Sequence, residues 1–215
     1  MPTVHSPRVS AKVAPILAAA SRLFVERGFE AVSMDAIAAE AGVSKATLYA
    51  HFQNKEALFL RILTDHVTEF SRRFDIPERF DPGADDAQEI LLRFGRSFAG
   101  AFRDDGEGFA LMRMFMSEMH RLPGAARVLH ENGPVRTRNQ LARLLASMTD
   151  AGALAISDFE MAADQLTSLL IGHDPMDRAV GLPPPPPAFV EARIRSAVGL
   201  FMRGYAAAGR KGRGQ

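Results

Sequence analysis

Side chains that can donate hydrogen bonds gather in one short stretch, residues 33–55. Hydroxyl, imidazole and ammonium groups arranged around one helix are suited to phosphate oxygens, which accept most of the hydrogen bonds that proteins make with DNA. Lys45 can also reach a guanine edge, the methyl and hydroxyl of Thr47 can touch bases, and a residue as small as Ala46 lets the backbone come close. The candidate contact residues are Ser33, Ser44, Lys45, Ala46, Thr47, Tyr49, His51 and Lys55.

These polar residues need helices that hold them in place. Ser33 can cap a short helix that ends at Gly42, and Ser44 can cap the next one, which carries Leu48 and Phe52 on its inner face. Helices this short are not stable alone. An apolar stripe on a helix expected at about residues 9–27 supports them and completes a three-helix unit with a helix-turn-helix at residues 33–52. The stripe consists of Val13, Ile16, Leu17, Ala20 and Phe24.

The rest of the chain also predicts helices, because its apolar residues recur at spacings of three and four. Residues 122–124 should end or kink one of them, and Ser157 with Glu160 matches a capping box. Residues 173–187 should form a long loop that ends in five prolines. The expected helices span residues 54–75, 85–102, 109–120, 134–150, 158–171 and 189–208.

The predicted fold class is therefore all-α, with an N-terminal three-helix domain (residues 1–53) and a larger C-terminal helical bundle (residues 54–215). The 215 residues are 47% hydrophobic and can bury a core, and the absence of cysteine excludes disulfide and thiolate chemistry.

The formal net charge of the chain is only +1. DNA binding must therefore depend on local charge, and the six basic and four acidic residues between Arg8 and Lys55 leave +2. Without a signal peptide or an apolar run of membrane-spanning length, we expect a soluble, cytoplasmic protein.

An enzyme is the rival class of function. The combinations of acidic and histidine residues, such as Glu118 with His120 or His130 with Glu131, lack a recognised metal-binding spacing. No serine elbow, phosphate loop or dinucleotide fingerprint is present, so we expect no catalytic residue, metal or cofactor. A helical adaptor that binds only a protein partner is a third class, which the basic and aromatic residues around Tyr49 disfavour.

The segments ERGFEAVSM, DAIAAEAGVSKATLYAHF and NKEALF, in this order, closely resemble the DNA-binding motif of TetR-type transcriptional regulators. The resemblance implies a homodimer that inserts one recognition helix into each half-site of a palindromic operator. It also implies a C-terminal domain that binds a small effector and then releases the DNA. We expect this effector to be apolar or amphipathic. A repressor is expected, with a ligand-responsive activator as the alternative.

Family DNA contacts carried over by position fall on Ser33, Ser44, Lys45, Ala46, Tyr49, His51 and Lys55, while Thr47 occupies a variable base-reading position. The chain departs from the pattern at Ala50, where many relatives have a second aromatic residue. A stacking or backbone contact at that position is therefore not carried over.

The C-terminal part resembles one pattern among these regulators, from MFMSEMHRLPGAARVLHENGPVRTR to LFMRGY. A flexible methionine and phenylalanine stripe suits an adaptable apolar pocket, although ordinary core explains it equally. The candidate pocket residues are Phe98, Phe102, Met112, Phe115, Met116, Met119 and His120.

In the family, the last two long helices form a four-helix dimer interface. The candidate interface residues are Phe159, Ala162, Ala163, Leu166, Leu170, Ile194, Val198 and Phe201. Packing inside one chain is the alternative for each of them. The prolines at residues 183–187 could cover the interface, cross to the partner or form a passive loop.

Overall fold

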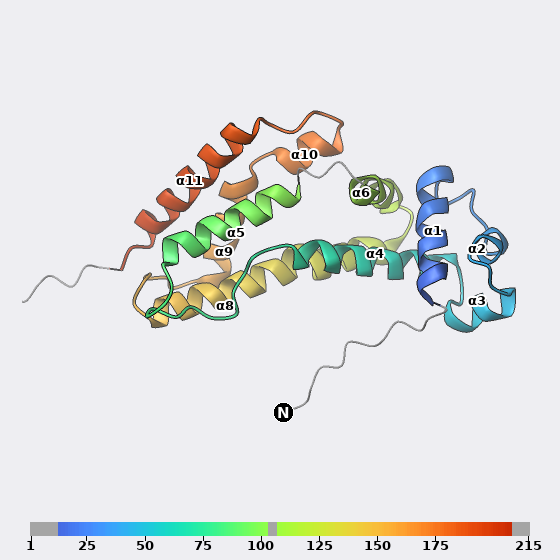
Figure 1. The fold of residues 1–215 in the computed structure, drawn as a ribbon, viewed down its shortest axis with the longest axis horizontal. Coiled ribbons are helices and arrows are strands. Elements are labelled where there is room, and N and C mark those ends of the chain that lie inside the picture. Colours follow the sequence, from blue (N-terminus) through green and yellow to red (C-terminus); the bar gives the residue numbers. More distant parts are fainter. Residues whose placement is uncertain (1–12, 103–106, 208–215) are drawn as a thin grey trace, which may run out of the picture. The chain divides into compact units, whose positions relative to one another are not determined.

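A computed structural model describes residues 13–102 and 107–207, and within these ranges every regular element is a helix (Figure 1). The expected all-α fold class is therefore confirmed. No helix in the described ranges is long and apolar enough to cross a membrane. The elements are α1 (Val13–Arg27), α2 (Met34–Glu40), α3 (Lys45–His51), α4 (Lys55–Arg72), α5 (Ala87–Ala101), α6 (Glu107–Glu118), α7 (Pro123–His130), the π-helical turn η1 (Glu131–Val135), α8 (Arg136–Asp150), α9 (Phe159–Ile171), α10 (Asp174–Ala179) and α11 (Pro187–Gly204).

The chain folds as two compact units, and the first contains residues 13–67 and 107–130. Its core holds a cluster of phenylalanine rings. The Phe59 centroid lies 5.0 Å from that of Phe29, 6.0 Å from that of Phe24 and 5.1 Å from that of Phe115. This unit is larger than the expected domain of residues 1–53, because the first part of α4 and helices α6 and α7 share the core of the short helices.

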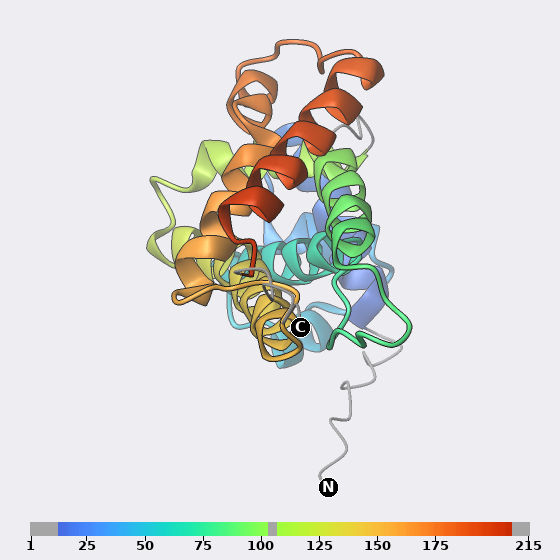
Figure 2. The ribbon, with the colours of Figure 1, turned by 90° about the vertical axis from the view of Figure 1, so that its left-hand side faces the viewer.

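The second unit contains residues 68–102 and 131–207. Helix α9 packs against α8, α5 and α11, and α11 also lies along α5 (Figures 1 and 2). The approach of α5 to its neighbours is close. A Cβ atom at Gly95 would lie 2.8 Å from both Leu170 Cδ2 and Ile194 Cγ2. Any side chain at position 95 would force Leu170 or Ile194 to shift.

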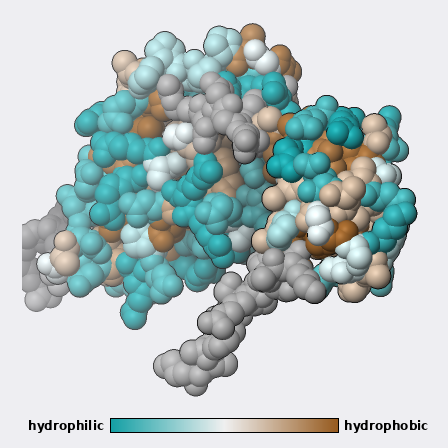
Figure 3. Space-filling view, turned by 45° about the vertical axis from the view of Figure 1, so that its right-hand side comes forward, coloured by the Kyte–Doolittle hydropathy of each residue, from teal (hydrophilic) through white to brown (hydrophobic). Residues whose placement is uncertain are grey.

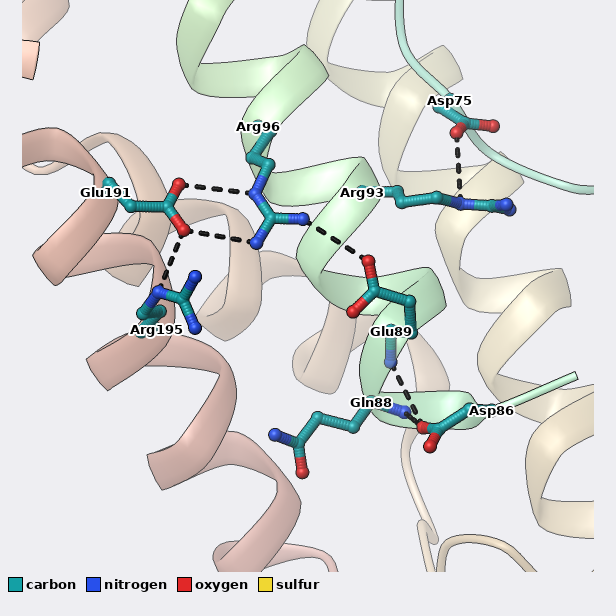
Figure 4. Close-up of polar contacts among 8 residues, drawn as sticks. All are labelled: Asp75, Asp86, Gln88, Glu89, Arg93, Arg96, Glu191 and Arg195. Carbon is teal, nitrogen blue, oxygen red and sulfur yellow. Dashed lines mark hydrogen bonds and ion pairs between the residues drawn. The ribbon is translucent and has the colours of Figure 1, made fainter.

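Ion pairs at the surface of the second unit join α5 to α11 (Figure 4). Arg96 donates from Nε and Nη2 to the two carboxylate oxygens of Glu191, at 3.2 and 3.1 Å. The bidentate contact with Arg96, helped by Arg195, holds the pKa of Glu191 below its ordinary value, and the same contact raises the pKa of Arg96. Both side chains remain about one third exposed, so water screens the pair.

Several helix boundaries agree with the sequence and others correct it. Ser33 and Ser44 cap α2 and α3 as expected, and Asn54 caps α4 in the same way, each accepting a bond from the amide three residues later. The capping box expected at Ser157 is wrong by one residue. Asp158 is the N-cap of α9, because its carboxylate accepts a bond from the Met161 amide.

Two short helices were not expected from the sequence. Helix α7 begins at Pro123 and α10 has Pro175 in its first turn, so both prolines stand where a helix needs no amide donor. The loop expected at residues 173–187 is therefore partly helical. The helix expected from residue 134 begins at Arg136, after η1. Residues 9–12 of the first expected helix lie outside the described residues.

Most α9 and α11 residues expected at a dimer interface lie inside the chain itself. They are buried in the core of the second unit and offer no surface to a second copy, whereas Phe159 is half-buried. Packing within one chain therefore explains why they are apolar. The buried residues are Ala162, Ala163, Leu166, Leu170, Ile194, Val198 and Phe201.

Candidate nucleic-acid interface

Helices α2 and α3 are held at a defined angle by local bonds and a shared core. Ser44 Oγ accepts a bond from the Thr47 amide at 3.1 Å. The turn between the helices passes through Gly42, whose φ of 66° is a left-handed conformation that glycine adopts without strain. Ile37 of α2 and Leu48 of α3 are fully buried, so both helices are fixed against the core of the first unit.

The side of α3 opposite Leu48 is exposed. Lys45, Ala46 and His51 are exposed, and Tyr49 is 50% exposed despite its large ring. Ala50, where the family pattern has an aromatic residue, is also exposed. Figure 3 shows hydrophilic and hydrophobic residues intermixed over the surface that faces the viewer. Four of the candidate contacts of α3 are thus accessible to a partner: Lys45, Ala46, Tyr49 and His51.

The candidate serine and threonine residues already have partners. The oxygens of Ser33 and Ser44 accept bonds from the amides of their own helices, so the Ser33 hydroxyl has its proton left to donate outward. Ser44 and Thr47 also share a hydroxyl–hydroxyl bond, which uses the proton of one of the two. Thr47 is half-buried, and its Oγ1 lies 2.9 Å from Ser44 Oγ. These contacts set the positions of the hydroxyl groups before any nucleic acid binds.

Lys55 has a structural role that the sequence did not reveal. Its ammonium group donates to the backbone carbonyls of Phe29 and Glu30, at 2.6 and 3.1 Å, and lies 4.4 Å from the centre of the Phe29 ring. The start of α4 is thereby tied to the loop between α1 and α2. A lysine ammonium has three N–H groups, so one remains for a phosphate oxygen.

The candidate effector-pocket residues belong to both units. Phe98 is buried in the second unit, where its ring lies 5.4 Å from that of half-buried Phe102. In the first unit, Phe115 is fully buried in the core. The other members on α6 and just after it differ in exposure: Met112 and Met119 are half-buried, and Met116 and His120 are exposed. Their assignment to one pocket stays a prediction.

A hollow of about 280 Å³ lies in the second unit, between the loop before α5 and helix α8. None of its residues was expected from the sequence, because a loop and a helix some sixty residues apart in the chain form it together. The lining is mainly polar: Ile76, Pro77, Glu78, Arg79, Gln140 and Arg143.

Family models match most of the chain. Residues 16–62 match the model of bacterial regulatory proteins of the TetR family, and residues 89–207 match the C-terminal domain of AefR-like transcriptional repressors. The HTH-type transcriptional activator FasR of Mycolicibacterium smegmatis is 54% identical over 52 residues, which is 24% of each chain. The uncharacterized HTH-type transcriptional regulator YhgD of Bacillus subtilis is 28% identical over 185 residues, covering 76% of this chain and 86% of YhgD.

Solved structures of regulators have the same fold. The Flavonoid-responsive Regulator FrrA superposes with a TM-score of 0.80 at 34% identity, covering 92% of this chain and 98% of FrrA. A TetR-family regulator from Mesorhizobium loti superposes with a TM-score of 0.74 at 24% identity, covering 93% of this chain and 98% of that one. These relatives are regulators and not enzymes. With its helix-turn-helix, the chain belongs to the TetR family of DNA-binding transcriptional regulators.

Proposed function

We propose that two copies of this chain bind a palindromic operator in the cytoplasm, repress transcription, and leave the DNA when a small effector binds. The observation that carries the proposal is the geometry of α3. The Ser44 cap and buried Leu48 fix this helix, while Lys45 and Tyr49 stand exposed on its other side. A helix with a fixed inner side and a polar outer side can enter the major groove without rearranging.

We favour repression over activation because the similarity to repressors covers a longer part of the chain than the similarity to an activator. The AefR-like repressor model covers the C-terminal region, residues 89–207. The likeness to the activator FasR covers only 52 residues. A ligand-responsive activator remains the second candidate.

Support for a homodimer comes from the outer sides of α9 and α11. Met161 and Leu169 of α9 are exposed, as are Phe189 and Leu200 of α11, although all four are large and apolar. These residues lie outside the buried positions of the two helices described above. Exposed apolar patches of this kind commonly mark an interface, and a second copy presenting the same helices would cover them.

Support for an aromatic effector comes from one relative and from one cluster in the second unit. FrrA is described as flavonoid-responsive. In this chain the Phe70 and Phe102 centroids lie 5.2 Å apart, and those of Phe74 and Phe98 lie 4.9 Å apart. Aromatic rings stack well on planar aromatic ligands. We therefore propose a planar, mainly apolar effector, which must bind the DNA-free state more tightly than the DNA-bound state.

The test is selection of bound sequences from random duplex DNA with the full-length protein. We expect a palindromic consensus with half-sites about one helical turn apart. Binding without sequence preference would overturn the proposal. A panel of flavonoids is then titrated into the protein–operator complex. Dissociation of the complex supports release by an effector, and continued binding at saturating flavonoid contradicts the proposed effector class.

A further inference from the structure

Asp35 and Lys45 form an ion pair on the surface of the helix-turn-helix. Lys45 Nζ lies 2.5 Å from Asp35 Oδ2, and the two side chains are 64% and 58% exposed. Asp35 belongs to the first turn of α2, and Lys45 is the first residue of α3. An acceptor and a donor therefore stand side by side on adjacent helices, and both remain accessible to a third group.

Stability does not account for this arrangement. An exposed ion pair contributes little, because water solvates both charges and salt screens them. A carboxylate next to a DNA-contacting lysine also weakens the general attraction to phosphates. The dipole of α2 favours a carboxylate in its first turn, but this effect acts on Asp35 alone and does not involve Lys45. A donor on the DNA would use the lone pairs that Asp35 keeps beside Lys45.

The major-groove edge of a G·C pair has the complementary pattern. Guanine O6 and N7 are adjacent acceptors, and the N4 amino group of cytosine is a donor. Lys45 has three N–H groups, of which Asp35 engages one, so two remain for the guanine acceptors. Asp35 retains lone pairs for the cytosine amino group. An A·T pair places its donor between two acceptors and does not match an ammonium that needs two adjacent acceptors.

We infer that Asp35 and Lys45 together recognise one G·C base pair in each operator half-site. The inference rests on the proposed function, because it requires α3 to enter the major groove. Lys45 supplies the attraction to guanine. Asp35 orients the ammonium group of Lys45. It also lowers the affinity for any base pair without an amino group at the cytosine position, because its carboxylate then has no donor to accept from. Asp35 is thus a specificity-determining residue on α2, outside the recognition helix.

The test measures binding of the full-length protein to its selected operator and to variants in which each half-site base pair is replaced symmetrically. For the wild-type protein, replacing the contacted G·C pair by A·T should cost about tenfold in affinity. For Asp35→Ala, the same replacement should cost about twofold or less, with unchanged discrimination elsewhere. Freed from Asp35, Lys45 should contact a phosphate instead, so the salt dependence should steepen by about one unit of log affinity per unit of log salt.

Glu40→Ala is the matched control. Glu40 is also an exposed carboxylate of α2 and forms an ion pair with Arg22 of α1. Its removal changes the net charge by the same amount and should leave discrimination intact. Asp35→Asn serves as a second variant that keeps the side-chain shape, and it should shift the preference from G·C toward A·T, since a carboxamide matches adenine.

Unchanged G·C discrimination in both Asp35 variants would overturn the inference. A selected half-site without any preferred G·C pair would overturn it as well, while leaving the proposed function intact. If the wild-type protein shows no sequence preference at all, it is the proposed function that fails.

Discussion

The two compact units differ in what positions their helices. In the first unit, α2 and α3 each begin at a serine that accepts a bond from an amide three residues later. In the second unit, α5, α9 and α11 are positioned by contacts between residues far apart in the chain, such as Gly95 with Leu170 and Ile194. Helices α5 and α9 also begin at capping residues, Asp86 and Asp158, so both units combine local caps with packing. The caps matter more in α2 and α3, because each of these helices has only seven residues and few backbone bonds of its own. Variants at the two kinds of position should therefore behave differently.

The largest effect is expected for Gly95→Ala. The new methyl group would lie 2.8 Å from Leu170 Cδ2 and Ile194 Cγ2, so buried side chains must shift. Overpacking costs about 1–3 kcal/mol, and the higher helix propensity of alanine returns about 1 kcal/mol. We expect a net loss of up to about 2 kcal/mol in the free energy of unfolding, measured by urea denaturation.

Gly100→Ala in the same helix is its control. A Cβ atom at Gly100 meets nothing within 4 Å, so this variant should gain about 0.5–1 kcal/mol. Equal effects of the two substitutions would mean that α5 is not closely packed at Gly95.

A smaller and more local effect is expected for Ser44→Ala. Loss of this N-cap costs about 1 kcal/mol. Hydrogen exchange should show faster exchange of the α3 amides with little change in α5, together with weaker operator binding. Ser117, whose hydroxyl donates to the Met114 carbonyl within α6, is not a cap, and Ser117→Ala is the control. A uniform loss of protection across both units would contradict local specification of α3.

The smallest effect is expected for Glu191→Gln, which removes the ion pair with Arg96 (Figure 4). The folded chain holds the pKa of Glu191 below its ordinary value. This contribution is therefore complete above the ordinary glutamate pKa of about 4.3, and it is lost as the pH falls through the lowered pKa. Urea denaturation at neutral pH should show slightly lower stability for Glu191→Gln, and the difference should shrink as the pH falls below the ordinary glutamate pKa. A difference that does not shrink in acid would contradict the ion pair as its cause.

The same contrast explains what could be predicted from the sequence. The caps at Ser33 and Ser44 and the turn at Gly42 were predictable because each depends on a few neighbouring residues. The tie between Lys55 and the carbonyls of Phe29 and Glu30 was not, because it joins residues more than twenty positions apart.

Apolar periodicity has a further limit in the second unit. The spacing of apolar residues identified which side of α9 and α11 is apolar. It could not distinguish burial by the chain itself from burial by a second copy. Ala163 and Ile194 are covered by their own chain, whereas Leu169 and Phe189 remain exposed. The residues that line the hollow beside Arg79 and Arg143 could not be predicted from the sequence either, because a loop and a distant helix form it together.

The most direct test of the central claim, that the exposed side of α3 binds the operator, is fluorescence anisotropy with wild-type protein, Lys45→Ala and Arg22→Ala. Arg22 is also an exposed, ion-paired cation of the first unit, but it belongs to α1. Lys45→Ala should weaken operator binding about tenfold without changing the oligomeric state, and Arg22→Ala should change it much less. Unchanged affinity in Lys45→Ala, or equal losses in the two variants, would contradict the claim.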